Sequence, residues 1–389
     1  MPGFRAKQIL EWVYAKGVAD PAEMTNLSKR DRDLLAAEMK FLSGEIIADQ
    51  AGSDGTRKLL IQWDDAGQRD AEPEQEAHGA TGETLGTGQR ATGLHSRLKV
   101  FDAAMSEGLD TSRQTECVMI PAGEWATGDE DDDGEPMRKK WARRTACVSS
   151  QVGCPVGCKF CASGIGGLDG NLSAGRIVEQ VWRLSRLPGV ERITNVVFMG
   201  MGEPLSNFQN VTRAIRILTS LWATGISARK ITISTVGLPK AIERLAEEFE
   251  LPVTLALSLH APNDDVRRQL IPWAEYTTIP ELLAACQKWF DKTGREITLE
   301  YILLGSVNDR PEHARGLAGL ARTLRANVNL IRYNEVKGMP FSRPGDQEVL
   351  TFQKVLRDAG VNVHIRASRG RDIAAACGQL RHEKTAGVE

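Results

Sequence analysis

The sequence lacks a long apolar run and a secretory leader. A membrane-spanning helix needs about 20 consecutive apolar residues, and nothing in the 389 residues resembles such a run. The first residues lack the charged and apolar regions of a signal peptide. Cysteine is also scarce: the seven cysteines are too few for a disulfide framework in a chain of this length. We therefore expect a cytoplasmic protein with free thiols and no membrane part.

The sequence also has little net charge, −2 at pH 7. Acidic residues are concentrated in two stretches. Residues 66–114 contain eight acidic and five basic side chains. Residues 122–142 contain seven acidic and three basic side chains. Neither stretch has hydrophobic periodicity, so we interpret both as flexible, solvated insertions. The net charges of the two stretches are −3 and −4, and that of the whole chain is −2, so the rest of the chain has a net charge of about +5. This mildly basic balance suits an RNA partner.

No G-x-G-x-x-G motif follows the first strand of the pattern that starts at residue 144, which argues against a dinucleotide-binding fold. Apolar runs alternate there with helix-like segments, and this alternation predicts a parallel sheet with helices outside. Six such units predict an α/β fold, a partial (β/α)6 barrel with its chemistry at the carboxyl ends of the strands. The predicted strands are residues 145–149, 193–199, 230–236, 252–259, 296–304, 328–333 and 361–365, and the predicted helices are 174–187, 211–221, 239–248, 279–293, 310–324 and 347–359.

The rest of the chain has a different pattern. An amphipathic helix is predicted over residues 4–14 and a second one over 29–40, with strands at 56–63 and 116–120. We divide the chain into four parts: a helical, RNA-binding module (1–50), a short β extension with the two insertions (51–143), the barrel (144–371) and a C-terminal segment (372–389).

Three cysteines follow the first barrel strand with the spacing C-x3-C-x2-C: Cys154, Cys158 and Cys161. Thiolates are the ligands that iron–sulfur clusters prefer. A structural zinc site would need a fourth Cys or His nearby, and the sequence has none there. Three ligands on a four-iron cluster leave one iron open for chemistry. The spacing resembles that of the radical S-adenosylmethionine (SAM) superfamily, and it predicts a [4Fe–4S] cluster whose open iron binds SAM.

Polar residues recur where the predicted strands end. Gly202 and Glu203 follow the second strand, and Glu203 offers a carboxylate to an amino group. Each group, taken singly, could simply cap a strand end; their recurrence on successive strands favours a ligand site for SAM. The candidate SAM-binding residues are Gly202, Glu203, Ser234, Ser258, Leu259, His260 and Asn334.

Cys377 follows a basic loop that contains Arg366, Arg369 and Arg371. A lone cysteine after three alanines is by default a small buried hydrophobic residue. A neighbouring arginine cluster would instead favour a nucleophilic thiolate, and the arginines could also contact phosphates. The residues alone leave these interpretations open.

Several motifs, in order along the chain, resemble the RlmN family of radical SAM adenine-C2 methyltransferases, which act on 23S ribosomal RNA and in some bacteria on tRNA. The resemblance covers nearly the whole chain outside the two insertions. Its motifs are Cys147-Val-Ser-Ser-Gln-Val-Gly-Cys154, Gly200-Met-Gly-Glu-Pro204, Ser258-Leu-His-Ala261 and Ala375-Ala-Cys-Gly-Gln-Leu380, with residues 4–9 and 54–58.

This resemblance implies roles for the matching residues. Cys154, Cys158 and Cys161 would hold the cluster. Cys377 would take a methyl group from a first SAM, and a radical made from a second SAM would activate that methyl for addition to adenine C2. Cys147 would release the product by forming a disulfide with Cys377, and Glu116 would accept a proton. The resemblance also implies a low-potential electron donor such as flavodoxin, and we expect a monomer.

Three other functions remain open from the sequence. A Cfr-type enzyme, which methylates adenine C8, would share the cluster and both thiols. A non-catalytic iron–sulfur RNA-binding protein would leave Cys147, Cys377 and Glu116 without a purpose. A radical SAM enzyme for a small molecule fits the basic remainder and the C-terminal arginines less well.

Overall fold

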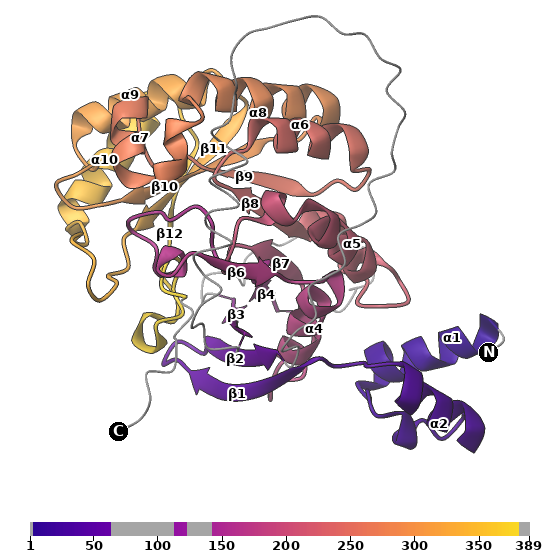
Figure 1. Ribbon diagram of the computed structural model, residues 1–389. Helices are drawn as coiled ribbons and strands as arrows, with labels where there is room; N and C mark the ends of the chain where they lie inside the picture. Colours follow the sequence, from indigo (N-terminus) through magenta and orange to yellow (C-terminus); the bar gives the residue numbers. More distant parts are fainter. Residues whose placement is uncertain (1–2, 64–112, 123–141, 381–389) are drawn as a thin grey trace, which may run out of the picture.

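One ten-stranded sheet organises the molecule, in the order β1-β2-β3-β4-β7-β8-β9-β10-β11-β12 (Figure 1). The computed structural model describes residues 3–63, 113–122 and 142–380. The predicted insertions 66–114 and 122–142 lie almost wholly outside these ranges, and so do residues 381–389. Within the described residues, β1 and β12 are the unpaired edges of an open sheet.

Seven neighbouring strands of the sheet run parallel, joined by helices on the outer face. This confirms the predicted α/β fold of six strand–helix units and a final strand. The strands are β4 (Arg144–Cys147), β7 (Asn195–Phe198), β8 (Ile231–Thr235), β9 (Thr254–Ser258), β10 (Ile297–Leu303), β11 (Ala326–Arg332) and β12 (Val363–Arg366). The helices are α4 (Ala174–Leu184), α5 (Phe208–Thr219), α6 (Pro239–Glu248), α8 (Ile279–Thr293), α9 (Pro311–Arg322) and α10 (Asp346–Asp358).

The core lies between these helices and the sheet. In β9, Leu255, Ala256 and Leu257 are all fully buried, because both faces of a parallel strand are covered and the apolar run need not alternate. The helix boundaries follow from capping residues. In α8, Thr278 and Glu281 form a capping box, and Gly294 ends the helix in the left-handed conformation.

An antiparallel extension continues the sheet beyond β4. It consists of β1 (Gly44–Ala51), β2 (Arg57–Trp63) and β3 (Arg113–Pro121). Strand β1 was not predicted, because this edge strand is largely exposed and shows no alternation of apolar residues. Strand β3 pairs with β4 and sets Val118 opposite Cys147.

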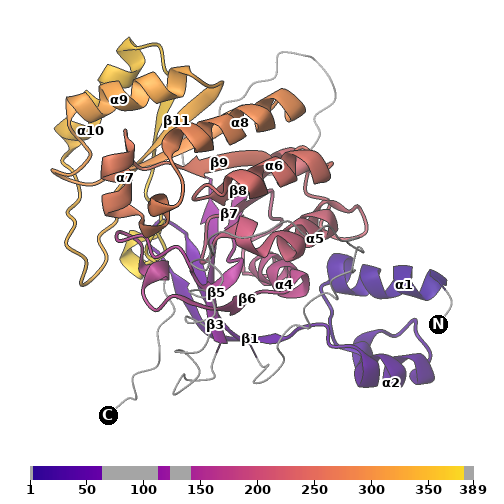
Figure 2. The ribbon, with the colours of Figure 1, turned by 45° about the horizontal axis from the view of Figure 1, so that its top comes forward.

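The N-terminal helices α1 (Gly3–Leu10) and α2 (Lys29–Glu38) lie beside α4, away from the sheet (Figure 2). The predicted first helix changes at Glu11 into a wider π turn that ends at Lys16. The indole of Trp182 in α4 donates a 2.7 Å hydrogen bond to the carbonyl of Val13. None of the helices in the described parts of the chain is long and apolar enough to cross a bilayer.

Two short elements support the cysteine loop. The hairpin of β5 (Gln151–Gly153) and β6 (Leu168–Asn171) brackets the loop. Helix α7 (Asp264–Leu270), which was not predicted, packs beneath it: the backbone N–H of Lys159 donates to the carbonyl of Leu270 at 2.9 Å. The loop is therefore fixed by main-chain contacts at its base and its middle.

Candidate active site

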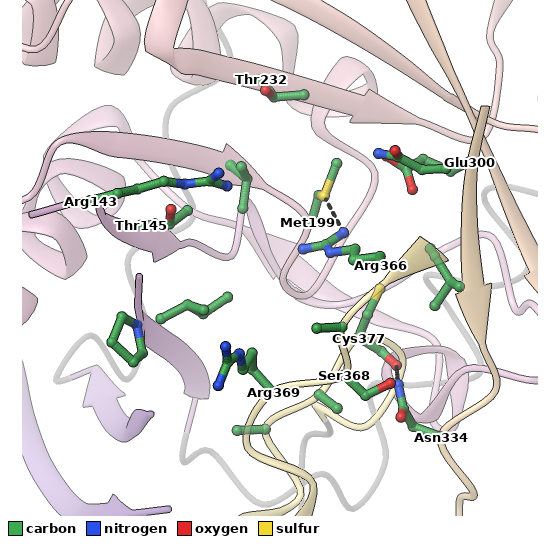
Figure 3. Close-up of a pocket in the computed structure, with 18 of the residues that line it drawn as sticks. Arg143, Thr145, Met199, Thr232, Glu300, Asn334, Arg366, Ser368, Arg369 and Cys377 are labelled. Atoms are coloured by element: carbon green, nitrogen blue, oxygen red, sulfur yellow. Dashed lines mark hydrogen bonds between the residues drawn. The ribbon is translucent and has the colours of Figure 1, made fainter. Parts of the chain in front are cut away.

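Two adjoining cavities lie on the inner face of the sheet: one of about 500 Å³ over the middle of the strands, and one of about 130 Å³ at their carboxyl ends. The smaller is lined by the cysteine loop and the strand ends, and the larger by β3, β4, the middle of the sheet and the loop after β12. Figure 3 shows the larger cavity, with Met199, Arg366 and Cys377 gathered on one side. The two cavities share five lining residues: Met199, Glu300, Ile331, Arg366 and Cys377.

All three cysteines of the loop line the smaller cavity as free thiols. Burial raises the pKa of Cys158 well above its usual value, and the charges of Cys161 and Cys154 raise it further. Three thiolates gathered here would therefore need a cationic partner. No three His, Cys, Asp or Glu side chains in the described ranges are arranged to hold a single metal ion. The three free thiols of one loop, all on the wall of the smaller cavity, fit a [4Fe–4S] cluster in which each would cap a different iron.

Glu203 is buried at the end of β7, beside the cysteine loop. Its Oε1 accepts from the N–H of Leu205 at 2.9 Å and its Oε2 from the N–H of Val236 at 2.7 Å. Burial raises the pKa of Glu203 to about 7, against the lowering effect of these hydrogen bonds. The preceding Gly202 has φ +101°, and an added Cβ would meet the Cβ of Gln151 at 2.7 Å. The backbone thus holds a carboxylate at the cavity wall.

Ser234, Ser258 and His260 come together on the same wall. The hydroxyls of Ser234 and Ser258 are 3.2 Å apart. His260 accepts a hydrogen bond from the N–H of Ile302 at Nδ1, and its ring meets Phe160 of the cysteine loop edge-on. Burial lowers the pKa of His260 to about 3, so the ring is neutral and supports the loop.

The structure places the predicted Leu259 and Asn334 differently from those three residues. Leu259 is fully buried, packs in the core and lines neither cavity. Asn334 lines the larger cavity. Its amide donates to the carbonyl of Cys377 at 3.2 Å and its Oδ1 accepts from Arg343. Asn334 therefore holds the loop that carries Cys377.

Cys377 and Cys147 face the same region from different elements, and both are free. Cys377 lines both cavities, whereas Cys147 is 7% exposed and lines neither. Burial raises the pKa of Cys147 to about 12, and the charge of Cys377 adds to this effect. Burial also raises the pKa of Cys377, while the nearby Arg366 lowers it. The two thiols are thus electrostatic neighbours.

Glu116 lies on β3, the strand that pairs with β4, which carries Cys147. It forms a 2.7 Å ion pair with Lys58, and Lys58 also donates to the carbonyl of Ala374 at 3.4 Å. Glu116 does not line either cavity. The ion pair connects the β extension to the loop that carries Cys377.

Glu300 is a site residue that sequence reasoning missed. It is 3% exposed and lines both cavities. Its Oε1 accepts from Asn329 at 3.0 Å, but its Oε2 has no hydrogen-bond partner. A buried acceptor left unpaired is costly, and such groups often face a ligand. The available signal was a single acidic residue inside the apolar strand β10.

The comparisons with known proteins agree with this geometry. Residues 148–318 match the family model of the Radical SAM superfamily, and residues 2–40 match that of the ribosomal RNA large subunit methyltransferase N-terminal domain. The probable dual-specificity RNA methyltransferase RlmN of Symbiobacterium thermophilum is 42% identical over 384 residues, which cover 98% of this chain and 86% of the relative. This chain belongs to the RlmN family.

Other RlmN relatives and a solved structure extend the match. The dual-specificity RNA methyltransferase RlmN of Marinobacter nauticus is 37% identical, covering 97% of this chain and 86% of that protein. A radical SAM methyltransferase from Sphaerobacter thermophilus has 36% identity and a TM-score of 0.78, covering 98% of this chain and 94% of that chain. The predicted resemblance, the radical SAM fold and the class of radical SAM RNA methyltransferase are confirmed. Membership of the superfamily implies a [4Fe–4S] cluster and SAM.

Proposed function

We propose that this enzyme methylates the C2 carbon of an adenine in 23S ribosomal RNA, and an adenine of tRNA as well, through a methyl group carried on Cys377. The observation that supports this proposal is that Cys377 lines both cavities. The names of the relatives, dual-specificity RNA methyltransferases, support RNA as the substrate. Adenine C2 is electron-poor and not nucleophilic, so direct polar transfer from SAM is not available to it.

The residues of the smaller cavity fit the two implied cofactors. Cys154, Cys158 and Cys161 would each cap one iron of a [4Fe–4S] cluster, and Glu203 would accept a hydrogen bond from the SAM amino group. When bound, the cluster and SAM supply the radical that removes a hydrogen atom from the methyl group on Cys377. Gly202, Ser234, Ser258 and His260 of this cavity would contact the rest of SAM. The predicted Leu259 and Asn334 lie outside its lining, and their contact with SAM stays a prediction.

Cys377 would receive its methyl group by nucleophilic displacement. Its thiolate attacks the methyl carbon of a first SAM, a new S–C bond forms, and S-adenosylhomocysteine leaves with the electron pair of the broken C–S bond. Arg366 supports this step. Burial alone would lower the pKa of its guanidinium, but Cys377, Glu300 and Cys147 raise it overall. The guanidinium therefore stays charged beside the thiol and favours its thiolate form.

Cys147 and Glu116 would complete the reaction after the methyl carbon has joined adenine C2. We propose that the adduct radical loses its C2 proton to Glu116 and one electron, which would return to the oxidised cofactor. The Cys147 sulfur then attacks the Cys377 sulfur: the S–S bond forms, the bond between the Cys377 sulfur and the methylene carbon breaks, and that carbon takes the electron pair and the proton of the Cys147 thiol to become the methyl group of the released base. Burial and the raised pKa of Cys147 would keep its thiol protonated and protected until then.

RNA would approach through the larger cavity, where Arg143 and Arg369 lie across from Cys377 (Figure 3). Guanidinium groups suit phosphate contacts. A reducible cluster and free thiols fit a reducing compartment, and we propose the cytoplasm. A low-potential donor such as flavodoxin would supply electrons to a monomeric enzyme.

The deciding experiment is mass spectrometry of nucleosides from ribosomal RNA and tRNA after anaerobic reaction with reconstituted enzyme, SAM and reductant. We expect 2-methyladenosine in both RNAs. Formation of 8-methyladenosine would instead identify a Cfr-type enzyme. The absence of both products with an intact cluster would contradict the proposal.

Variants of the two thiols test the carrier role directly. Cys377→Ala should abolish methylation while the protein keeps its iron, because the methyl carrier is gone but the cluster ligands remain. Cys147→Ala should accumulate a covalent protein–RNA adduct, visible as a slower band on a denaturing gel. Cys286→Ala is the matched control, since Cys286 is buried in the core away from both cavities. An active Cys377→Ala enzyme would overturn the carrier role.

A further inference from the structure

Arg267, on α7, is a fully buried cation behind the wall of the smaller cavity. Its side chain is 0% exposed. It lies outside the cavity lining, while Val236, His260 and Cys158 form the wall in that region. A buried guanidinium normally finds partners for all its donors, so the contacts of Arg267 indicate what it does.

Two of the three guanidinium nitrogens are occupied by strand ends. Nη2 donates to the carbonyl of Val236 after β8, and Nε donates to the carbonyl of Leu259 after β9 at 3.3 Å. The same Val236 donates its N–H to Glu203. Arg267 thus fixes the backbone that in turn orients the carboxylate of Glu203.

The third nitrogen, Nη1, is buried and has no hydrogen-bond partner. Burial lowers the pKa of Arg267 to about 10, and the charges of Cys158 and Asp264 raise it. Asp264 has a partner of its own, because its Oδ1 accepts from the N–H of Ile279 at 2.8 Å. The buried charge therefore lies directly behind the wall of the smaller cavity, and α7 reaches the cysteine loop itself through the carbonyl of Leu270, which accepts from the N–H of Lys159.

We propose that Arg267 is a positioning residue that fixes the ends of β8 and β9 and places a positive charge behind the smaller cavity, near Cys158. This inference rests on the proposed cluster. The charge and hydrogen bonds around a cluster set its reduction potential. Reduction adds an electron, and a nearby positive charge stabilises the more negative state. Arg267 therefore makes the potential less negative than it would otherwise be.

The experiment is an anaerobic redox titration, followed by electron paramagnetic resonance, of reconstituted R267Q, R267M and R267K, with iron and sulfide contents measured in parallel. Arg268 supplies the matched control: it is the next residue on α7, but it is exposed and paired with Asp265. We expect R267Q and R267M to bind iron with a more negative midpoint potential. R267K, which keeps the charge, and R268Q should stay near the wild-type value.

Wild-type potentials in R267Q and R267M at full iron content would overturn the proposal. If the neutral variants fail to fold, R267K decides. A midpoint potential that is shifted in R267K but not in R268Q would show that the charge is not the determinant and would overturn the proposal. A wild-type protein that takes up no iron would instead overturn the proposed function itself, and the inference with it.

Discussion

At the scale of single residues, the proposed contact of Glu203 with SAM would make SAM binding depend on pH. Burial raises its pKa to about 7, so the carboxylate fraction falls as pH drops through that value. The ionised carboxyl could accept a hydrogen bond from the SAM amino group with either oxygen, whereas the protonated carboxyl could accept well with only one. We therefore expect SAM affinity to weaken below about pH 7, approaching about tenfold per pH unit at lower pH.

Equilibrium binding of SAM to the reconstituted enzyme, measured across this range, checks the prediction. The E203Q variant should bind SAM weakly, and its affinity should vary less with pH than that of the wild type. A wild-type affinity that is constant from about pH 8 to about pH 5.5 would show that Glu203 does not accept from the ligand.

At the scale of elements, the β5–β6 hairpin controls the position of the cysteine loop. Gly153 has φ +74°, and an added Cβ would lie 2.0 Å from the carbonyl oxygen of Gly167. The same carbonyl accepts the N–H of Cys154. G153A should open the hairpin, because the obstacle is backbone, and it should cost at least about 1–2 kcal/mol of stability together with much of the bound iron.

Chemical unfolding and iron analysis test this expectation, with G319A as the control. Gly319 lies in α9, and an added Cβ there meets nothing within 4 Å. G319A should keep its iron and gain up to about 1 kcal/mol. Equal iron in both variants would mean that the hairpin does not position the loop.

Much of the fold could be predicted because each parallel strand is an apolar run between turn residues. The seven runs after residue 144 each coincide with a strand. Helix α7 could not be predicted from the sequence, because four of its seven residues are charged and the segment resembles a loop: Asp264, Asp265, Arg267 and Arg268. Its burial is decided by tertiary contacts with the cysteine loop.

The candidate site was predictable where polar residues end strands, as at Glu203 and Ser234. It was not predictable where a side chain acts from inside an element. Glu300 lies within β10, and nothing local distinguishes it from a structural carboxylate. The side chain of the predicted Leu259 lies in the core, and a pattern at a strand end does not tell a side-chain contact from a backbone contact.

At the scale of the whole molecule, Glu179 of α4 joins the N-terminal part of the chain to the barrel. It is 5% exposed, accepts from the N–H groups of Ser43 and Gly44, and pairs with Arg183 at 2.8 Å. E179A would leave two backbone donors without their acceptor and the half-buried Arg183 with only the carbonyl of Gly44. We expect it to cost about 3 kcal/mol of unfolding free energy.

Urea denaturation measures this cost against E248A, which removes an exposed i,i+4 pair with Arg244. The control should change stability by less than about 0.5 kcal/mol. Similar values for the two variants would mean that the N-terminal segment is held by other contacts.

Because Cys377 borders both cavities, the proposed carrier could be loaded from the smaller cavity and used in the larger one as separate events in time. SAM would then charge the enzyme before any RNA has arrived. A cell would then hold a reserve of enzyme already committed to one turnover. The first round of modification on newly made RNA would proceed at a pace independent of how quickly the carrier is recharged.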